Sequence, residues 1–414
     1  MIKKKRWEIT SFLVTNLLLF YFLNAGSKDD TDRNKNKKYF ESRQNNSFLI
    51  KAKKNRQKKN VNGFMSGARK SDKGYLKTFG YNKKKGTDEG YTKQQKEIPD
   101  FMCYVKGGMF CYGPLTSNLV SKPMPYARAR ISDFYIDETE VSNLEYRKYL
   151  AILEERNNEL NEYSSEEPPV FDINSSNVVF YTLKYNLEKN LDEEYIKNAR
   201  PDMDVIKSGF ENTMAEVYMS DYFDNESYNY YPVVGITYNQ AVEFTKWRTL
   251  YMNEYRAENG LPMSPSFSLP SYAQWQYAAF GWIKTKCLYP WGSSYTTDKD
   301  GNLMANFKVS SGNYDTSSAN NSYPSNVYKF KPNDWGIYDM GGNVAEYVID
   351  SYDISFLDYG NRLDPVCKSD DKIKIVCGGS YLSSAAELQC GAIDTIPCDL
   401  ARPDVGFRCI LPVV

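Results

Sequence analysis

The chain has 414 residues, of which 41% are hydrophobic, and its mean hydropathy is −0.61, so the sequence indicates a water-soluble body large enough for a sizeable core. It contains no histidine, which excludes Ser-His-Asp and Cys-His nucleophiles, His-ligated metals and imidazole acid–base chemistry. Net charge is zero, with 52 basic and 52 acidic residues, but the charges are unevenly distributed. Residues 1–98 contain 25 basic and 9 acidic residues, and the rest of the chain contains 27 basic and 43 acidic residues. This asymmetry predicts a basic arm in front of an acidic domain.

Residues 1–27 have the pattern of a signal peptide or membrane anchor. Four basic residues precede an apolar run from Phe12 to Leu23, which is short for a spanning helix and typical of a secretory signal. Residues 23–26 resemble a bacterial lipobox with Gly26 in place of the cysteine that would carry lipid. We therefore expect export without lipid attachment, either with cleavage after Ala25 or with an uncleaved tether.

Residues 28–98 form a basic, low-complexity segment with few large apolar side chains, so we expect a disordered linker. The segment suits contact with an acidic partner or a membrane surface, and it equally suits a linker that is only solvated. No nucleic-acid partner is expected, because an exported chain does not meet nucleic acid.

From residue 99 onward, strand and helix patterns alternate as in an α+β domain. Residues 101–112 have a hairpin pattern around two glycines, and residues 130–136 have the pattern of one strand. Ser142 and Glu145 form a capping box for a helix that continues through Leu150.

The middle of the chain is predicted to add a long segment and two more helices. Residues 154–227 are acidic and rich in Tyr and Asn, and we interpret them as an insertion packed on the domain surface. Apolar periodicity predicts a helix over residues 239–259, and Ser271 caps a further helix.

Residues 333–347 contain two adjacent glycines between two acidic side chains, with aromatics on both sides. Adjacent glycines predict a tight turn whose carbonyl groups can point inward. Asp339 and Glu346 bring carboxylates to this turn and Asn343 brings an amide oxygen, and such mixed oxygen ligands are typical of Ca²⁺ sites. The alternative interpretation is a buried, aromatic-rich turn without an ion.

The eight cysteines include no C-x-x-C pair, which argues against zinc-ribbon and thioredoxin-like sites. A disulfide between Cys103 and Cys111 is compatible with the predicted hairpin. The pairing of the others stays open.

Seven blocks follow one another in the order typical of the formylglycine-generating-enzyme (sulfatase-modifying factor) domain, so the chain from 99 to 414 resembles that family. The blocks are residues 135–143, 231–237, 269–275, 289–292, 333–347, 378–381 and 405–409. The resemblance implies a loop-rich α+β fold of the C-type-lectin-like kind.

The resemblance also implies two structural calcium sites. The first would use the side chains of Asp339 and Glu346 and the carbonyls of Gly342 and Val344, with Glu140 able to contribute. The second would use Asn306, the Phe307 carbonyl and Asn320. The family's acidic ligand falls near Ala319 or Asn320 here, so the negative charge is missing and the affinity for calcium would be lower.

The enzymes of this family bind copper through two cysteines that follow the Gly-Gly-Ser-Tyr block. The matching positions here are Ser383 and Leu388, and neither is a thiol. Because Cu(I) requires soft ligands, the resemblance implies a pseudoenzyme with no copper and no catalytic residue. The alternative is a formylglycine-generating-type oxidase with a relocated copper pair at the nearby Cys377 and Cys390, or another enzyme of this fold, such as a hydrolase that uses carboxylates.

The long insertion and residues 247–249, 305–308 and 343–346 resemble one branch of the family, the gliding-motility and type IX secretion lipoproteins GldK (PorK) and GldJ. This implies a non-catalytic periplasmic subunit that assembles into a ring at the outer membrane with a GldN/PorN-like partner. GldL/GldM-like motor proteins would couple to that ring. A lectin-like ligand binder is a third possibility, and it would need an open aromatic pocket.

Overall fold

The computed structural model describes residues 99, 101–113, 127–162, 178–210, 221–281, 287–309, 323–353, 355, 362–369 and 371–413. All of them belong to one compact unit made of residues 73–167 and 176–414, whereas the second unit, 1–72 and 168–175, contains no described residue. The expected signal segment, the expected linker and Asn320 therefore lie outside the described residues. Among the residues that are described, no helix has both the length and the apolar character needed to cross a bilayer.

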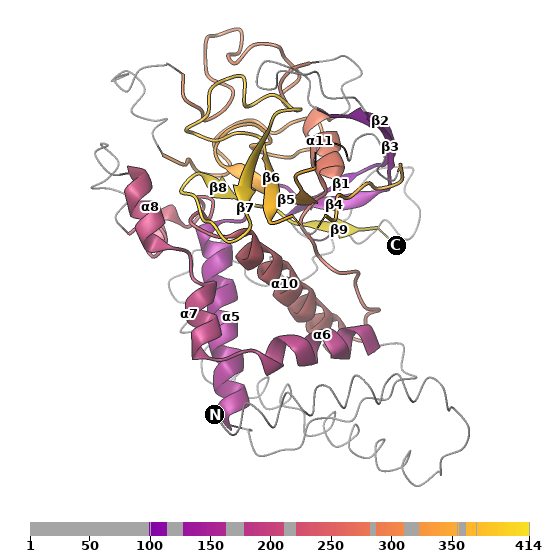
Figure 1. The fold of residues 1–414 in the computed structure, drawn as a ribbon, viewed down its shortest axis with the longest axis vertical. Helices are drawn as coiled ribbons and strands as arrows, with labels where there is room; N and C mark the ends of the chain where they lie inside the picture. The colour runs from indigo at the N-terminus through magenta and orange to yellow at the C-terminus, as the bar shows by residue number, and fades with distance from the viewer. Residues whose placement is uncertain are drawn as a thin grey trace. The chain divides into compact units, whose positions relative to one another are not determined.

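The described strands form three sheets, which lie together in the upper part of Figure 1. The first has the order β1-β4-β9 and consists of Met102–Val105, Phe134–Asp137 and Ile410–Pro412. The second pairs β2 with β3, which are Gly108–Tyr112 and Ala127–Ile131. The third has the order β7-β6-β5-β8 and consists of Ile393–Pro397, Ile373–Cys377, Ala345–Ser351 and Val405–Gly406.

Two strand predictions are wrong, one in the pairing of the strands and one in the number of strands. β1 and β2 do not form a hairpin, because β1 pairs with β4 and β2 pairs with β3. The predicted single strand over residues 130–136 is divided at Ser132 into β3 and β4, which belong to different sheets. Asp133, between β3 and β4, is hydrogen-bonded to the segment between β1 and β2, since its Oδ1 accepts a hydrogen bond of 2.9 Å from the Gly107 amide. A Cβ atom on Gly107 would lie 2.2 Å from the Ile131 carbonyl oxygen, so this crossing requires glycine.

The three predicted helices are confirmed as α5 (Asn143–Glu162), α10 (Tyr238–Glu258) and α11 (Tyr272–Phe280). Each begins with a side chain that caps its free backbone amides. Ser142 Oγ accepts a hydrogen bond of 3.3 Å from the Glu145 amide, and Glu145 accepts one of 2.8 Å from the Ser142 amide. Complete capping boxes also precede α10, at Thr237, and α11, at Ser271.

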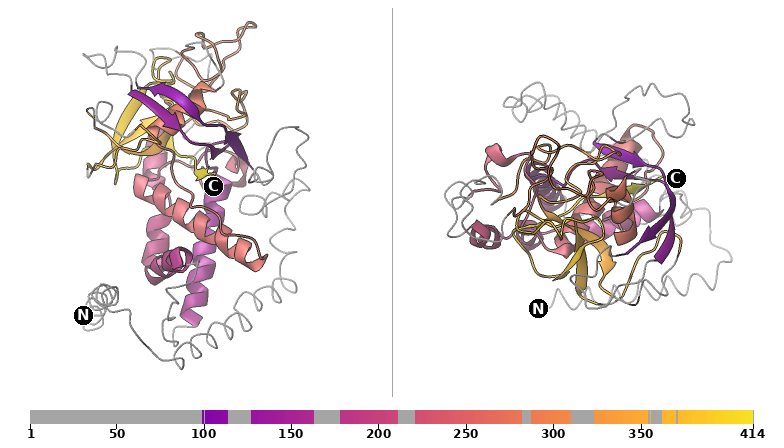
Figure 2. Two further views of the ribbon diagram at one scale, coloured as in Figure 1. Left: turned by 90° about the vertical axis from the view of Figure 1, so that its right-hand side faces the viewer. Right: turned by 90° about the horizontal axis from the view of Figure 1, so that it is seen from above.

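The segment interpreted as an insertion is largely helical. Its described part contains α6, α7, α8 and the 3-10 helix η3, which are Val178–Lys189, Glu193–Ala199, Met203–Phe210 and Glu226–Tyr228. In Figures 1 and 2, α6 and α7 lie against α5 and α10, below the sheets. Burial raises the pKa of Glu254 on α10, but the charges of Lys184 on α6 and Arg156 on α5 outweigh that effect and leave the pKa below its usual value. These ion pairs join the insertion to the rest of the domain.

Aromatic side chains fill the core between the helices and the sheets. Tyr146 on α5 stacks on Phe244 of α10 with ring centroids 5.7 Å apart, and Phe244 meets Phe407 edge-on at 5.2 Å. A second cluster surrounds Trp275 on α11, and a smaller one contains Tyr289 and Leu388. The glycine-rich turn ahead of β5 lies where these clusters meet.

Candidate functional site

The turn before β5 has a backbone that few sequences allow. Asp339, Gly342 and Asn343 have φ angles of 51°, 87° and 63°, in the left-handed region. A Cβ atom on Gly342 would lie 2.5 Å from the Asn306 carbonyl oxygen, so only glycine fits there. The tight turn predicted from the adjacent glycines is therefore present.

Asn343 is the hydrogen-bonding centre of the turn. Its side chain is fully buried; its Oδ1 accepts a bond of 2.7 Å from the Ser325 amide, and its Nδ2 donates one of 3.1 Å to Glu140 Oε1. Its backbone amide donates to the Asn306 carbonyl at 2.8 Å, and its carbonyl accepts from Tyr381 at 2.8 Å. The amide oxygen that the sequence assigned to an ion is thus directed at Ser325.

Glu346 is the buried partner of Arg408. The Arg408 Nε donates to Oε2 at 2.7 Å and its Nη2 donates to Oε1 at 2.6 Å, while the Trp275 indole donates to Oε2 at 2.7 Å. Burial lowers the pKa of Arg408, but the Glu346 carboxylate outweighs this and raises it above its ordinary value. Both oxygens of Glu346 are therefore engaged in hydrogen bonds within the protein.

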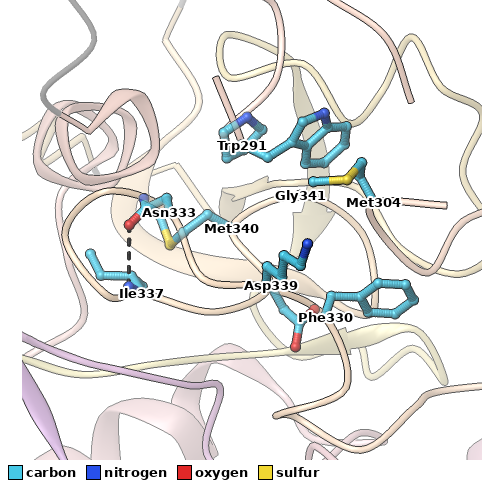
Figure 3. A pocket seen from close by; sticks show the side chains of 10 residues that line it. Trp291, Met304, Phe330, Asn333, Ile337, Asp339, Met340 and Gly341 are labelled. Atoms are coloured by element: carbon cyan, nitrogen blue, oxygen red, sulfur yellow. Dashed lines mark hydrogen bonds between the residues drawn. The ribbon is translucent and has the colours of Figure 1, made fainter. Parts of the chain in front are cut away.

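Asp339, in contrast, has two carboxylate oxygens that are buried and without a hydrogen-bond partner among the described residues. Its side chain lines a cavity of about 10 Å³, enough for one water molecule or ion, together with Trp291, Met304 and Phe330 (Figure 3). Burial raises the pKa of Asp339 to about 8; the Glu346 charge adds to the rise, whereas Arg408 and Lys329 oppose it.

Glu140 is the second carboxylate with an unsatisfied oxygen. Its Oε1 accepts from Asn343, but Oε2 is buried without a partner among the described residues. Burial, and next the negative charge of Asp339, hold its pKa well above the ordinary value. Two buried carboxylates that repel each other, with unused hard oxygens, fit the ligand chemistry of Ca²⁺. The unsatisfied oxygens of Asp339 and Glu140 would be the ones to hold the ion.

The remaining predicted ligands fall into two groups. Gly342 and Val344 lie in the same turn as Asp339 and are buried. Asn306 joins the second predicted site to the first, because its Nδ2 donates to Asn343 Oδ1 at 3.3 Å and its carbonyl accepts from the Asn343 amide at 2.8 Å. Its Oδ1 has no partner among the described residues. Phe307 packs in the apolar cluster with Tyr289.

Ser383 and Leu388, which the family resemblance places at the copper-binding positions, have different surroundings. Leu388 is completely buried against Tyr289, Ala305 and Phe307. The Ser383 hydroxyl lies 3.4 Å from that of Ser380, and the Ser383 carbonyl accepts a bond of 2.9 Å from the Lys308 amide. The local structure at both positions is therefore a packed turn built from hydrocarbon and hydroxyl groups.

The nearest thiols to this turn are buried in the cluster around Trp275. Cys377 and Cys390 are both free thiols there. Burial, followed by the charges of Glu346 and Asp350, raises the pKa of Cys377 well above its ordinary value, and burial does the same for Cys390. The hairpin disulfide between Cys103 and Cys111 is absent, since both are free and their strands belong to different sheets.

Sequence reasoning missed three residues that organise this region. Arg408 lies within a quoted family block and Trp275 at the end of another, yet no pattern assigned them to Glu346. Ser325 carries no signal in the sequence.

A family model described as "Sulfatase-modifying factor enzyme 1-like domain" (FGE-sulfatase) matches residues 88–413. The chain is 25% identical over 185 residues to the formylglycine-generating enzyme of Mus musculus, which covers 43% of this chain and 44% of that protein. It is 25% identical over 191 residues to the "Inactive C-alpha-formylglycine-generating enzyme 2" of Bos taurus, a match that covers 43% of this chain and 50% of that protein. The chain thus spans about half the length of these curated relatives.

Among solved structures, PvdO from Pseudomonas aeruginosa aligns with a TM-score of 0.46 and 16% identity, covering 80% of this chain and all of PvdO. The family match extends through the helical insertion and includes every described residue. The predicted α+β fold is confirmed, and the chain belongs to the FGE-sulfatase family of sulfatase-modifying factor enzyme 1-like domains.

Proposed function

We propose that this chain is a non-catalytic structural component of the type IX secretion and gliding-motility machinery. The observation that carries the proposal is the environment of Leu388. A hydrocarbon side chain buried among Tyr289, Ala305 and Phe307 stands where the family's enzymes place a copper-binding thiol. Since Cu(I) needs thiolate ligands, a domain with serine and leucine at these positions serves as a scaffold.

The role in the secretion machinery rests on the resemblance to the GldK (PorK) and GldJ branch. In that role the domain is a periplasmic ring subunit associated with the outer membrane. It forms a homo-oligomer, binds a GldN/PorN-like protein and couples to GldL/GldM-like motor proteins. An acidic domain that follows a basic arm offers complementary charges for repeated contacts between subunits.

Co-purification from the native cell envelope tests this role. The tagged full chain, cross-linked before extraction, is expected to retain copies of itself and a GldN/PorN-like protein. An unrelated acidic periplasmic protein with the same tag is the control for capture by charge alone. Recovery of the chain as a monomer with no protein above that control would overturn the assembly role.

Anchoring without lipid is a separate part of the proposal. Radiolabelled palmitate is expected to leave the chain unlabelled, because Gly26 cannot form the thioether that carries diacylglycerol. The matched variant Gly26→Cys completes the lipobox and is expected to gain the label. Labelling of the unmodified chain would show that lipid attaches elsewhere.

We also propose that Ca²⁺ stabilises the turn before β5. Asp339 and Glu140 Oε2 supply oxygens that have no hydrogen-bond partner in the described part of the chain, and the carbonyls of Gly342 and Val344 lie in the same turn. Burial, followed by the charges of neighbouring carboxylates, opposes ionisation of Asp339 and Glu140 and raises both pKa values, and a bound cation would offset this cost of ionisation. Glu346 acts beside the ion by holding Arg408 in place.

A further inference from the structure

A second hollow lies next to the Asp339 cavity and is open to solvent. This aromatic groove has a volume of about 380 Å³ and is lined by Trp291, Tyr295 and Met304 and by the polar residues Ser293, Thr297, Asp298 and Lys299. Its volume falls within the range of about 300–1,000 Å³ that is usual for small-molecule sites. It shares Trp291 and Met304 with the Asp339 cavity but is lined by none of the carboxylates assigned to calcium.

Trp291 forms a rigid wall of the groove. Its ring stacks on Tyr289, with centroids 4.7 Å apart and planes inclined by 8°. Its Nε1 donates to the Tyr295 carbonyl at 2.8 Å, so the only polar atom of the indole is already bonded. A ligand in the groove therefore meets the ring's remaining face and edge, which offer apolar stacking contact and no hydrogen-bond donor.

Tyr295 supplies a second aromatic surface. Tyr295 is 76% exposed, so most of its ring is accessible to a ligand in the groove. The Tyr295 amide donates to Ser293 Oγ at 3.0 Å, which fixes the backbone beneath the ring. Two aromatic side chains are thus held at one groove, one of them mostly in water.

The opposite rim is a preorganised polar loop. The Asp298 amide donates to the Asn302 carbonyl at 2.9 Å, and the Met304 amide donates to the Thr296 carbonyl at 2.9 Å. Hydrogen bonds from Asn302 lower the pKa of Asp298, so its carboxylate stays charged at neutral pH. Lys299 and Thr297, both exposed, extend from the same loop. The rim therefore combines an anion, a cation and hydroxyl groups.

We propose that the aromatic groove binds a neutral, linear glycan. A pyranose ring has a face of C–H groups that stacks on an aromatic ring, and a rim of hydroxyls that both donate and accept hydrogen bonds. Trp291 and Tyr295 offer the first kind of contact. Ser293, Thr297, Asp298 and Lys299 offer the second.

Charge distinguishes this ligand from the other classes. A cationic ligand would be attracted by Asp298 and repelled by Lys299, and an anionic ligand would experience the reverse. A neutral polyhydroxylated ligand can use both side chains without repulsion. The open shape of the groove suits a chain that passes across it, whereas an apolar side chain from a protein partner would need a deeper pocket. This inference is independent of the proposed secretion role.

Isothermal titration calorimetry on the full chain tests the inference. The probes are two neutral tetrasaccharides, the β-1,4-linked N-acetylglucosamine tetramer and maltotetraose, with tetralysine and tetraglutamate as charged comparisons. At least one tetrasaccharide is expected to bind at millimolar or lower concentration, and neither charged peptide is expected to do so. Tyr295→Ala is expected to weaken the binding about 10-fold through loss of one stacking surface.

Two matched variants complete the design. Tyr295→Phe keeps the aromatic ring and is expected to retain the affinity for the tetrasaccharide. Tyr230→Ala removes an aromatic residue that lies elsewhere on the domain and is 44% exposed, and it is also expected to retain the affinity. The thermal midpoint of each variant is measured first to show that it is folded. The inference is overturned if neither tetrasaccharide binds, if Tyr295→Ala binds as well as the unmodified chain, or if a charged peptide binds more tightly than both sugars.

Discussion

Arg408 and Glu346 form a two-fold hydrogen-bonded ion pair at the centre of the domain, with side-chain exposures of 0% and 1%. Arg408 also donates to the Asp137 carbonyl at 3.0 Å and the Tyr338 carbonyl at 2.8 Å. The pair therefore joins β8's C-terminal end, β5, β4 and the glycine-rich turn. The Glu346 carboxylate, which the sequence assigned to a calcium ion, therefore binds the guanidinium group of Arg408.

Breaking this pair is expected to destabilise the fold strongly. Arg408→Ala leaves Glu346 buried without its counter-charge and should lower the free energy of unfolding by about 3–5 kcal/mol. Chemical denaturation followed by circular dichroism measures the change. Arg200→Ala is the matched control, because its partner Asp224 lies in an exposed pair, and its cost should stay below about 1 kcal/mol. Equal losses in the two variants would contradict the role given to Arg408.

Asn343 is expected to be sensitive for two separable reasons. Asn343→Ala removes the hydrogen bonds to Ser325 and Glu140 and places an alanine in the left-handed region, so we expect a loss of about 2–4 kcal/mol. Asn343→Gly loses the same hydrogen bonds, but glycine adopts the left-handed backbone conformation without strain. Its loss of unfolding free energy should therefore be about 1 kcal/mol smaller than that of Asn343→Ala. If alanine is tolerated as well as glycine in denaturant titrations, backbone strain is not part of the effect.

Calcium is expected to raise the thermal midpoint through Asp339. Asp339→Asn should abolish the increase produced by added Ca²⁺, while its midpoint in chelator at neutral pH should match or exceed that of the unmodified chain, since the amide is buried without having to bind a proton, as the Asp339 carboxyl must. Glu346 is left intact here, because its loss would expose Arg408 under both conditions. Scanning calorimetry with and without Ca²⁺ measures the effect.

An exposed carboxylate provides the control for this experiment. Asp204 lies on α8, away from the turn, and Asp204→Asn should keep the full calcium response. An identical calcium shift in Asp339→Asn and Asp204→Asn would refute the assignment of the ion to Asp339.

The pH dependence of stability follows from the raised pKa of Asp339. The folded protein keeps this proton up to about pH 8, whereas an unfolded aspartate loses it near about pH 4. Between these values the folded state binds more protons, so this group's contribution to stability falls as pH rises and is lost by about pH 8. Relative to Asp339→Asn, the calcium-free chain should therefore become less stable from pH 6 to 8.

Asp350 separates this effect from buried carboxylates in general. Burial raises its pKa to about 6, although hydrogen bonds from the Cys367 and Tyr272 amides oppose the rise. Asp350→Asn should therefore alter the profile mainly below about pH 6. Saturating Ca²⁺ should flatten the upper part of the profile only in chains that retain Asp339. A profile between pH 6 and 8 that is the same in Asp339→Asn and the unmodified chain would exclude Asp339 as its source.

The sequence predicted local features well. The capping side chains Ser142 and Ser271 act within three residues of the groups they bind, so the helices they begin could be recognised from spacing. The helix over residues 239–259 was recognised from its apolar periodicity, and its capping residue Thr237 was not predicted. The tight turn at Gly342 was recognised for the same reason. The family fold followed from blocks that retain their order along the chain.

Distant contacts were beyond such reasoning. Whether β1 pairs with β2 or with β4 depends on Asp133, which is 26 residues from Gly107. Glu346 was assigned to an ion because its partner Arg408 lies 62 residues away, and a carboxylate in isolation carries no sign of which cation it meets. The side-chain oxygen of Asn343 was expected to bind the same ion, yet it accepts a hydrogen bond from the Ser325 amide. The oxygens of Asp339 and Glu140 that lack a partner among the described residues became visible only once burial and the hydrogen-bond donors of those residues were known.

The most direct test of the central claim is an oxidase assay. The purified full chain, supplied with Cu(I) and oxygen, is incubated with a peptide that carries a sulfatase-motif cysteine, and aldehyde formation is followed by mass spectrometry. A chain with Ser383 and Leu388 at the copper positions is expected to yield no formylglycine, while a formylglycine-generating enzyme run in parallel converts the peptide. Conversion by this chain would contradict its role as a non-catalytic structural component.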